Sequence, residues 1–452
     1  MTIPVAEQAH AGGGVREALV ATFRRVMRLY FRDIEWVGAR PGSGVRGRVF
    51  VANHTNALID PILIITGAGC AISPIAKSTL WDVPGLRWLL DRAGAVPIVR
   101  RVDAPDKAAA ANADAFGQIA AHLGGGGNIL IFPEGTSHSE PQLAPLRTGA
   151  ARMLVAAAAR GGEPPTFQAV GLEFDDRTDF RSRCLVLWGP VRRLADVAAD
   201  AAAGAPGGAS EAGAAGDADE ARVQAITAQM AADLRDLLIE GETHDERRRI
   251  MRVAELLASN AGEHSLGAWS DAGRQVELAN RTLRSVDAAV VARVAERVDA
   301  YYAELERLGL LDDQVTGAGP APRAPEPAWQ RAVLAPLAAA GFALYAIPYF
   351  LPRWFARSSD PDAVSTIKLG AALVVYPVWA AGLVTGALLL LPPPLSFAAA
   401  AVALASPFAA LRWLDVWYQR TREPTPDELA RLAELRRAAC EAIDDARRRL
   451  PS

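Results

Sequence analysis

Residues 369–391 form an apolar stretch without one charged side chain, and this stretch limits the folds open to the chain more than any other feature. A helix needs about 20 predominantly apolar residues to cross the hydrocarbon core of a bilayer. A shorter apolar stretch, residues 395–411, follows three prolines and suits a return helix. A third, residues 332–351, contains Pro336 and Pro348, and we expect it to dip into the interface instead of crossing. A buried hairpin in a soluble core is the alternative interpretation.

The charges around these stretches predict their orientation. Cytoplasmic loops of membrane proteins are enriched in Lys and Arg. Basic residues precede and follow the pair of long stretches, so we expect both ends in the cytoplasm and an even number of crossings. The first 20 residues lack the apolar core of a secretory signal, so we expect the part of the chain before the apolar stretches to stay on the cytoplasmic face of the cell membrane. The flanking basic residues are Arg353, Arg357 and Lys368 before the pair, and Arg412, Arg420 and Arg422 after it.

Composition narrows the class of protein. Of the 452 residues, 51% are hydrophobic, which is high for a soluble protein. The net charge of −3 gives no sign of nucleic-acid binding. The three cysteines (Cys70, Cys184 and Cys440) lie far apart and without CxxC spacing. This argues against disulfides and a zinc site, and agrees with a reducing cytoplasm.

Changes in composition divide the chain into segments. Residues 15–36 have apolar residues at helical spacing between many arginines, as in a helix that lies on an anionic membrane or packs on its own domain. Tracts rich in Ala and Gly, or in Pro and Gly, read as linkers. The expected segments are 1–45, with the amphipathic helix; 46–193, an α/β domain; 194–219, a flexible linker; 220–316, accessory helices; 317–330, a second linker; 331–411, the membrane region; and 412–452, a cytoplasmic helix.

The sequence VANHTNALIDP, residues 51–61, joins an expected strand to a helix through a loop that carries His54. Asp60 and Pro61 look like the start of that helix. An imidazole held by a nearby carboxylate can remove a proton from an alcohol near neutral pH. This pairing requires the loop to fold back, because the spacing does not fit one face of a helix. The alternative is that Asp60 only caps the helix.

Two further expected strands end in polar residues. Residues 129–132 lead into Glu134, Gly135, Thr136 and Ser137, a turn with a carboxylate, two hydroxyls and a glycine that lets a ligand approach the backbone. Residues 94–99 lead into Arg100 and Arg101. The planar guanidinium fork of Arg matches the oxygens of a phosphate.

Taken together, these motifs resemble the glycerolipid acyltransferase family over roughly residues 20–190. Residues 143–150 are similar to the family's Pro-Leu-Lys-x-Gly segment, with Arg147 replacing Lys. Residues 180–183 resemble the branch of the fungal glycerol-3-phosphate and dihydroxyacetone-phosphate acyltransferases. One departure is the five residues between His54 and Asp60, where four are common; we interpret it as a subgroup trait. The four matching blocks are Asn53, His54 and Asp60; residues 98–100; residues 132–136; and residues 169–174.

The resemblance implies an α/β domain with a mixed sheet flanked by helices. It implies transfer of a fatty acyl group from acyl-CoA or acyl-acyl-carrier protein to a hydroxyl of glycerol 3-phosphate, its 1-acyl form or dihydroxyacetone phosphate, without metal or cofactor. His54 would be the general base and Asp60 would orient it. Arg100 is the first choice for the phosphate, with Lys77, Arg101 and Arg147 as further candidates. The expected acceptor pocket comprises Glu134, Gly135, Thr136 and Ser137.

Two other classes of function stay open. The same base could activate water in a membrane thioesterase or lipid hydrolase, or the domain could be an inactive membrane scaffold. His138 lies just past the Glu-Gly turn and is a candidate for a supporting residue behind the site.

Overall fold

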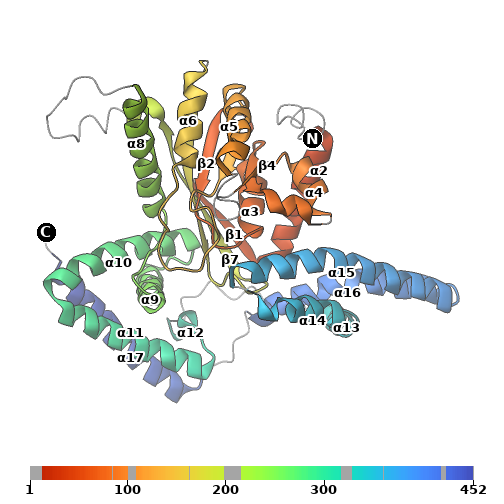
Figure 1. Ribbon diagram of the computed structural model, residues 1–452. Helices are drawn as coiled ribbons and strands as arrows, with labels where there is room; N and C mark the ends of the chain where they lie inside the picture. Colours follow the sequence, from red (N-terminus) through yellow and green to blue (C-terminus); the bar gives the residue numbers. More distant parts are fainter. Residues whose placement is uncertain are drawn as a thin grey trace. The chain divides into compact units, whose positions relative to one another are not determined.

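A seven-stranded mixed sheet forms the centre of the first of two compact units, residues 1–240 (Figure 1). The computed structural model describes residues 13–83, 85–99, 108–161, 163–197, 215–316, 328–359, 361–418 and 424–450. The strand order is β1-β7-β6-β2-β5-β3-β4. Strand β7 is antiparallel to β6, and every other neighbouring pair is parallel. The strands are β1 (Asp33–Gly38), β2 (Arg48–Ala52), β3 (Ser73–Lys77), β4 (Val96–Ile98), β5 (Ile129–Ile131), β6 (Thr166–Phe174) and β7 (Arg183–Arg193).

Helices pack against this sheet, and its inner strands consist of buried apolar residues. Val49 and Val51 of β2 and Ile129 of β5 are fully buried, as expected for parallel strands with covered faces. The predicted α/β class, with a mixed sheet flanked by helices, is confirmed. The helices of this unit are α2 (Gly13–Tyr30), α3 (Ile59–Ala68), α4 (Leu86–Ala93), α5 (Ala108–Gly124), α6 (Gly149–Ala159) and α8 (Ala215–Arg235), with a 3-10 turn at Ser78–Asp82.

The N-terminal helix α2 packs along α3. Its Met27 is buried, and its Arg24 donates to the backbone oxygen of Thr66 at 3.0 Å. These contacts favour the helix packed on its own domain over the surface-lying helix. The helix ends at Tyr30, earlier than predicted, because the following residues enter β1 beside β7.

Helix α8 also belongs to this unit. Its Val223, Ile226 and Met230 join the core that contains Phe167 of β6 and Leu154 of α6. The compact units divide between residues 240 and 241. The accessory helices therefore begin about 20 residues later than the sequence suggested, since α8 covers part of the sheet instead.

A bundle of helices occupies part of the second unit, residues 241–452. Helix α17 comes after the apolar stretches in sequence but packs along α11, which comes before them. Arg436 of α17 pairs with the buried carboxylate of Asp312 at 2.7 Å, and Tyr301 donates to the same carboxylate at 2.6 Å. The bundle is therefore built from both sides of the apolar region. Its helices are α9 (His244–Asn260), α10 (Leu266–Val286), α11 (Ala288–Leu308), α12 (Asp312–Thr316) and α17 (Pro426–Arg448).

The apolar stretches form helices. Two segments, Val364–Leu390 in α15 and Leu395–Asp415 in α16, are long and apolar enough to cross a bilayer. Helices α13 and α14 form a pair bent by 47°, which would make a third span only if both halves served as one. Gly341 of α13 lies against the backbone of Ser406 of α16, where no larger residue would fit. The bounds are α13 (Ala328–Leu344), α14 (Ala346–Phe355), α15 (Pro361–Leu390) and α16 (Leu395–Tyr418).

Candidate active site

The five parallel strands β6, β2, β5, β3 and β4 end at one edge of the sheet, and predicted site residues lie at the ends of β2, β5 and β3. Strands β2 and β5 lie side by side, with Val51 opposite Ile131. His54 comes three residues after Val51, and Glu134 three residues after Ile131. Lys77 ends β3. Ligands of open α/β sheets bind outside the carboxyl ends of the strands, so this edge is the expected position for a site.

The loop after β2 begins with an amide that extends the sheet. Asn53 donates to the backbone oxygen of Leu172 at 3.0 Å and accepts from the N–H of the same residue at 2.8 Å. The side chain is buried and takes the place of a backbone partner beside β6. It thereby fixes the point at which the chain turns toward His54.

The loop then folds back onto Asp60, as the spacing requires. One carboxylate oxygen, Oδ2, accepts from the N–H groups of Thr55 at 2.8 Å and Asn56 at 2.7 Å, and lies 3.0 Å from Nδ1 of His54. Helix α3 starts at Ile59, and the N-cap residue is Leu58. The interpretation of Asp60 as the N-cap is thus wrong, because its carboxylate bonds to the loop that precedes the helix.

This contact assigns the proton of the imidazole. A fully buried carboxylate beside Nδ1 favours the tautomer that carries the proton on that nitrogen, which leaves Nε2 as the acceptor. The His54 side chain is 17% exposed and Asp60 is 0% exposed. The imidazole stacks on Phe132, with ring centroids 4.0 Å apart. Burial, stacking and the carboxylate together restrict the ring to one orientation.

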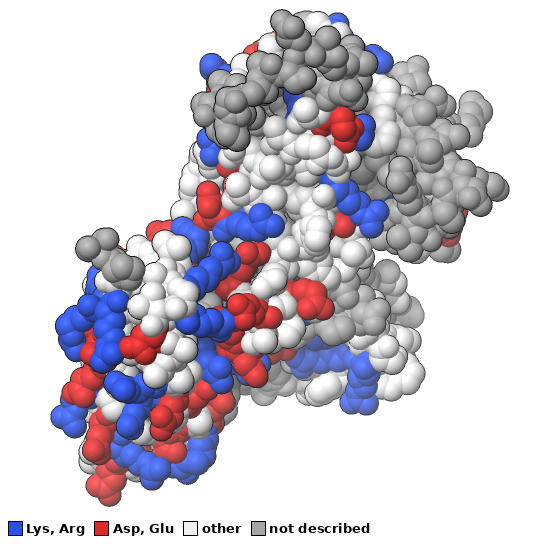
Figure 2. Space-filling model, turned by 60° about the vertical axis from the view of Figure 1, so that its left-hand side comes forward, with Lys and Arg blue, Asp and Glu red and all other residues white. Residues whose placement is uncertain are grey.

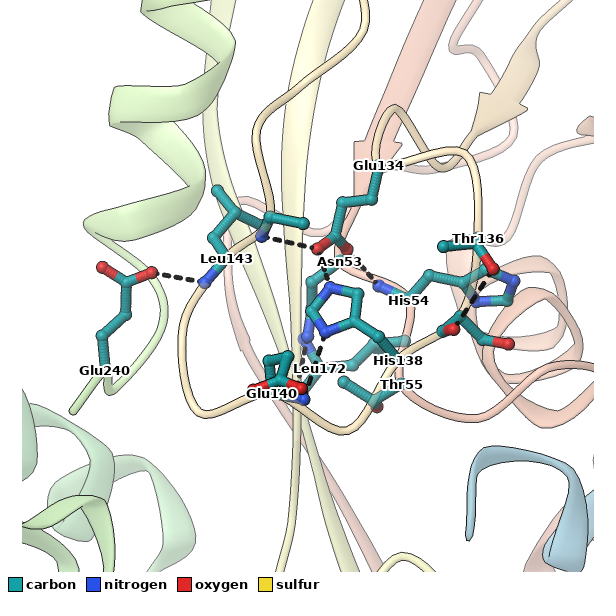
Figure 3. A network of polar contacts seen from close by, with 12 residues as sticks. Asn53, His54, Thr55, Glu134, Thr136, His138, Glu140, Leu143, Leu172 and Glu240 are labelled. Carbon is teal, nitrogen blue, oxygen red and sulfur yellow. Dashed lines mark hydrogen bonds and ion pairs between the residues drawn. The ribbon is translucent and has the colours of Figure 1, made fainter. Parts of the chain in front are cut away.

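Glu134 ties the loop after β2 to the turn after β5 (Figure 3). Its Oε1 accepts from the N–H of His54 at 2.8 Å, and its Oε2 accepts from the N–H of Ala144 at 3.0 Å. Oε2 also forms a short contact with Nε2 of His138, and the N–H of His138 donates to the backbone oxygen of His54 at 3.1 Å. Both oxygens of this buried carboxylate are engaged by the protein, so Glu134 holds the two loops together.

Gly135 has a φ of +80°, a conformation that side chains other than glycine rarely adopt. A Cβ there would lie 2.5 Å from Nε of Arg147, so the guanidinium of Arg147 lies across the turn. The hydroxyl of Thr136 is exposed and donates to the backbone oxygen of Ser137 at 3.3 Å. The turn thus presents polar groups and an exposed arginine beside His54. Arg100 and Arg101 lie outside the described residues.

The sequence did not reveal two features of this arrangement. Phe132 was an apolar strand residue with no sign that its ring would stack on His54. Asn56 donates through Nδ2 to the backbone oxygen of Arg177 at 3.0 Å, a contact between residues over a hundred positions apart. The resemblance to the acyltransferase family pointed to Asn53 as part of the block with His54 and Asp60. It did not indicate that the Asn53 side chain would bond to the backbone beside β6.

Among the described residues, no group of three or more His, Cys, Asp or Glu side chains could hold a metal ion.

Residues 40–170 match the family model described as Acyltransferase. These residues are an acyltransferase domain. An 81-residue stretch, 17% of the chain, is 38% identical to the Saccharomyces cerevisiae protein named glycerol-3-phosphate O-acyltransferase 2, and the match covers 11% of that relative.

A solved structure, the 1-acyl-sn-glycerophosphate (LPA) acyltransferase PlsC from Thermotoga maritima, superposes with a TM-score of 0.33 at 16% identity. The match covers 48% of this chain and 80% of that one.

The contact with Glu134 raises the pKa of His138, mainly through the hydrogen bond between them. A raised pKa in the folded state means that the pair stabilises the protein fully below the ordinary His pKa, and that this contribution is lost as pH rises through the raised value. We expect His138→Gln to lower Tm at acidic pH and to differ less from the wild type at alkaline pH. Measuring Tm against pH tests this, with the exposed His244→Gln as the control. A Tm difference independent of pH would contradict the ion pair.

Proposed function

We propose that the chain is a membrane-bound glycerolipid acyltransferase in phospholipid biosynthesis, with His54 as its general base. The observation that carries this proposal is the 3.0 Å contact between Nδ1 of His54 and the buried Asp60. The contact favours the tautomer that has its proton on Nδ1 and Nε2 as the acceptor. The family of residues 40–170 supplies the chemistry, which is acyl transfer.

The reaction follows from these groups. Nε2 of His54 takes the proton of the acceptor hydroxyl as its oxygen attacks the thioester carbonyl of acyl-CoA or acyl-acyl-carrier protein. Asp60 stabilises the imidazolium formed. When the tetrahedral intermediate collapses, the C–S bond breaks and the imidazolium returns its proton to the leaving thiolate. The products are an ester and a free thiol. Glu134 serves this step by positioning the backbone of His54.

The direct test is an acceptor panel. Purified protein in lipid, given labelled acyl-CoA, should form an ester with glycerol 3-phosphate, 1-acylglycerol 3-phosphate or dihydroxyacetone phosphate. The yeast relative's name favours glycerol 3-phosphate as the first to try. Free fatty acid released at the same rate with and without every acceptor would instead mean a thioesterase or hydrolase. No turnover of any donor would mean an inactive scaffold.

Arg100 remains our first choice for the acceptor phosphate. In the sequence it comes two residues after Ile98, the last residue of β4, which lies opposite Lys77 of β3. Arg147 offers a second cation, across the turn at Gly135. Lys77 and Arg101 complete the candidate set. Thr136 and Ser137 could donate hydroxyl hydrogen bonds to the acceptor.

For Arg100→Ala we expect the apparent KM for the phosphorylated acceptor to rise roughly 10–100-fold, the cost of losing a charge-assisted hydrogen bond. The KM for the acyl donor should change little. Arg100→Lys should restore part of the loss, because Lys cannot make the two-pronged contact. Steady-state kinetics in both substrates measures this. An unchanged acceptor KM would mean that Arg101, Lys77 or Arg147 binds the phosphate instead.

We further propose that α15 and α16 anchor the protein in the cell membrane, with the catalytic unit on the cytoplasmic face. Val378 and Leu389 of α15 are 68% and 78% exposed, an apolar surface that water does not favour. The packing of α17 on α11 supports an even number of crossings, because the chain must return to the side that it left. Helices α13 and α14 would then form a bent pair that enters without crossing.

Alkaline carbonate extraction tests the anchor. Full-length protein should stay in the membrane pellet. A variant with residues 328–418 replaced by a flexible linker should move to the supernatant, since insertion of a spanning helix is effectively irreversible and this variant has none. This variant keeps α17, and so leaves the bundle able to form. His54→Ala is the matched control and should remain in the pellet. Release of the full-length chain would contradict the anchor.

A further inference from the structure

The helical bundle contains a cavity of about 500 Å³ that the proposed reaction does not use. Helices α9, α10, α11 and α17 all line it. Pockets that hold small molecules measure about 300–1,000 Å³, so the volume suits a ligand of moderate size. The cavity lies wholly within the second compact unit.

Most of the residues in its walls are aliphatic. On α10 the lining residues Ala272, Val276, Ala279 and Leu283 follow each other at intervals of three and four, which puts them on one face of the helix. The two alanines lack the bulk to fill the space. No Phe, Tyr, Trp or His occurs among the lining residues. Such walls suit a flexible hydrocarbon chain and provide no aromatic surface for stacking a base or ring.

The ends of the cavity differ in charge. Near the C-terminal ends of α10 and α17 it is lined by Arg284 and Arg447; near the turn between α9 and α10 it is lined by Glu263 and Asp271. Arg284 is paired with Glu246 at 2.6 Å.

Arg447, in contrast, is exposed and has no ion pair with any residue in the described parts of the chain. Elsewhere on the bundle, acidic and basic side chains are intermixed (Figure 2). An anionic group would therefore be attracted to the Arg447 end.

We propose that this cavity binds one long-chain acyl group whose anionic head lies at Arg447. The aliphatic walls take the chain, and the cationic end takes a carboxylate or a phosphate. This site is separate from the edge of the sheet that carries His54, and the inference does not depend on the proposed acyl transfer. The head could belong to a free fatty acid, a 1-acylglycerol 3-phosphate or an acyl-CoA.

Photo-crosslinking tests the site directly. Full-length protein in phosphatidylcholine nanodiscs is irradiated with a palmitate analogue that carries a diazirine on its chain, and labelled peptides are mapped by mass spectrometry. We expect label on the lining faces of α9 and α10. Ala279→Trp should abolish that label by filling the cavity. Leu278→Trp adds the same side chain one position away, where Leu278 is 69% exposed, and should leave the label unchanged.

Competition experiments identify the head group of the bound acyl compound. Palmitate, 1-palmitoylglycerol 3-phosphate and palmitoyl-CoA compete for the label in separate arms, and the strongest competitor reveals the source of the acyl group. Arg447→Gln should weaken the anionic competitors by roughly fivefold, the factor given by about 1 kcal/mol for an exposed ion pair. It should not affect the neutral hexadecanol.

Several results would overturn the proposal: label only on α13 to α16, label retained in folded Ala279→Trp, or equal competition by the anionic competitors in wild type and Arg447→Gln. If Ala279→Trp unfolds the bundle, as judged by hydrogen exchange of α9 and α11, Ala272→Ile replaces it and should reduce the label in part. Full label in that folded variant is an equally negative result. His54→Ala should keep full label, which separates this site from the proposed reaction.

Discussion

Replacing His54 by Ala should reduce acyl transfer by about 10²–10⁴-fold while the protein stays folded and in the membrane. Nδ1 of this imidazole lies 3.0 Å from the fully buried carboxylate of Asp60, which leaves Nε2 as the nitrogen that would accept the hydroxyl proton. Single-turnover rates at saturating acyl donor and acceptor measure the loss. The mutation removes the Asp60 contact and the stacking on Phe132, so a modest fall in Tm is also expected.

A matched control variant separates loss of the general base from a general disturbance of the loops around His54. His138→Ala removes an imidazole from the same network, but from behind Glu134. It should reduce the rate less than His54→Ala, because it alters only the positioning of the loop. Turnover of His54→Ala near the wild-type rate, or equal losses in both variants, would contradict the assignment of the base.

For Asp60→Asn we expect a comparably severe loss of rate, about 10²–10⁴-fold, with little change in the binding of either substrate. One oxygen, Oδ2, contacts Thr55, Asn56 and His54 alike, so the amide can present only one of its two ends to all three. With its oxygen there, it keeps the contacts but carries no charge to stabilise the imidazolium. With its NH₂ group there, it loses the two backbone contacts and holds the imidazole in the wrong tautomer. Pre-steady-state kinetics with a bound acceptor separates this chemical step from binding.

Stability measurements distinguish the two functions of this carboxylate. The structure assigns it both the loop contacts and the His54 contact. If Asp60→Asn lowers Tm and leaves the rate unchanged, the carboxylate serves only the loop. Asp175→Asn, which alters an exposed pair with Arg183, is the control and should have a small effect on both quantities.

The edge of the sheet was predictable because it depends on short segments. Buried strands such as β2 and β5 read as runs of apolar residues, and parallel strands bring the residues after them to one edge. His54 and Glu134 were found in this way. The direction in which Glu134 points was not, since its partners at His54 and Ala144 come from separate loops.

The packing partners of two helices, α8 and α17, could not be predicted from the sequence. The apolar residues of α8 could cover any exposed apolar face, and only the three-dimensional fold assigns them to the core with Phe167. Likewise residues 412–452 were predicted only as a cytoplasmic helix, while α17 packs on α11, which lies more than a hundred residues earlier. Both assignments depend on long-range contacts, which local sequence patterns and helix propensity do not predict.

The ion pair between Arg436 and Asp312 has a consequence for how the protein is made. Asp312 leaves the ribosome before the apolar helices and Arg436 after them, so the bundle cannot be completed until α15 and α16 have been synthesised. Until then Asp312 lacks its guanidinium partner, and the surface of α11 that α17 covers is open. Chains that fail to insert their apolar helices, or that lose their last 27 residues, would therefore carry an incomplete bundle, which quality control could recognise.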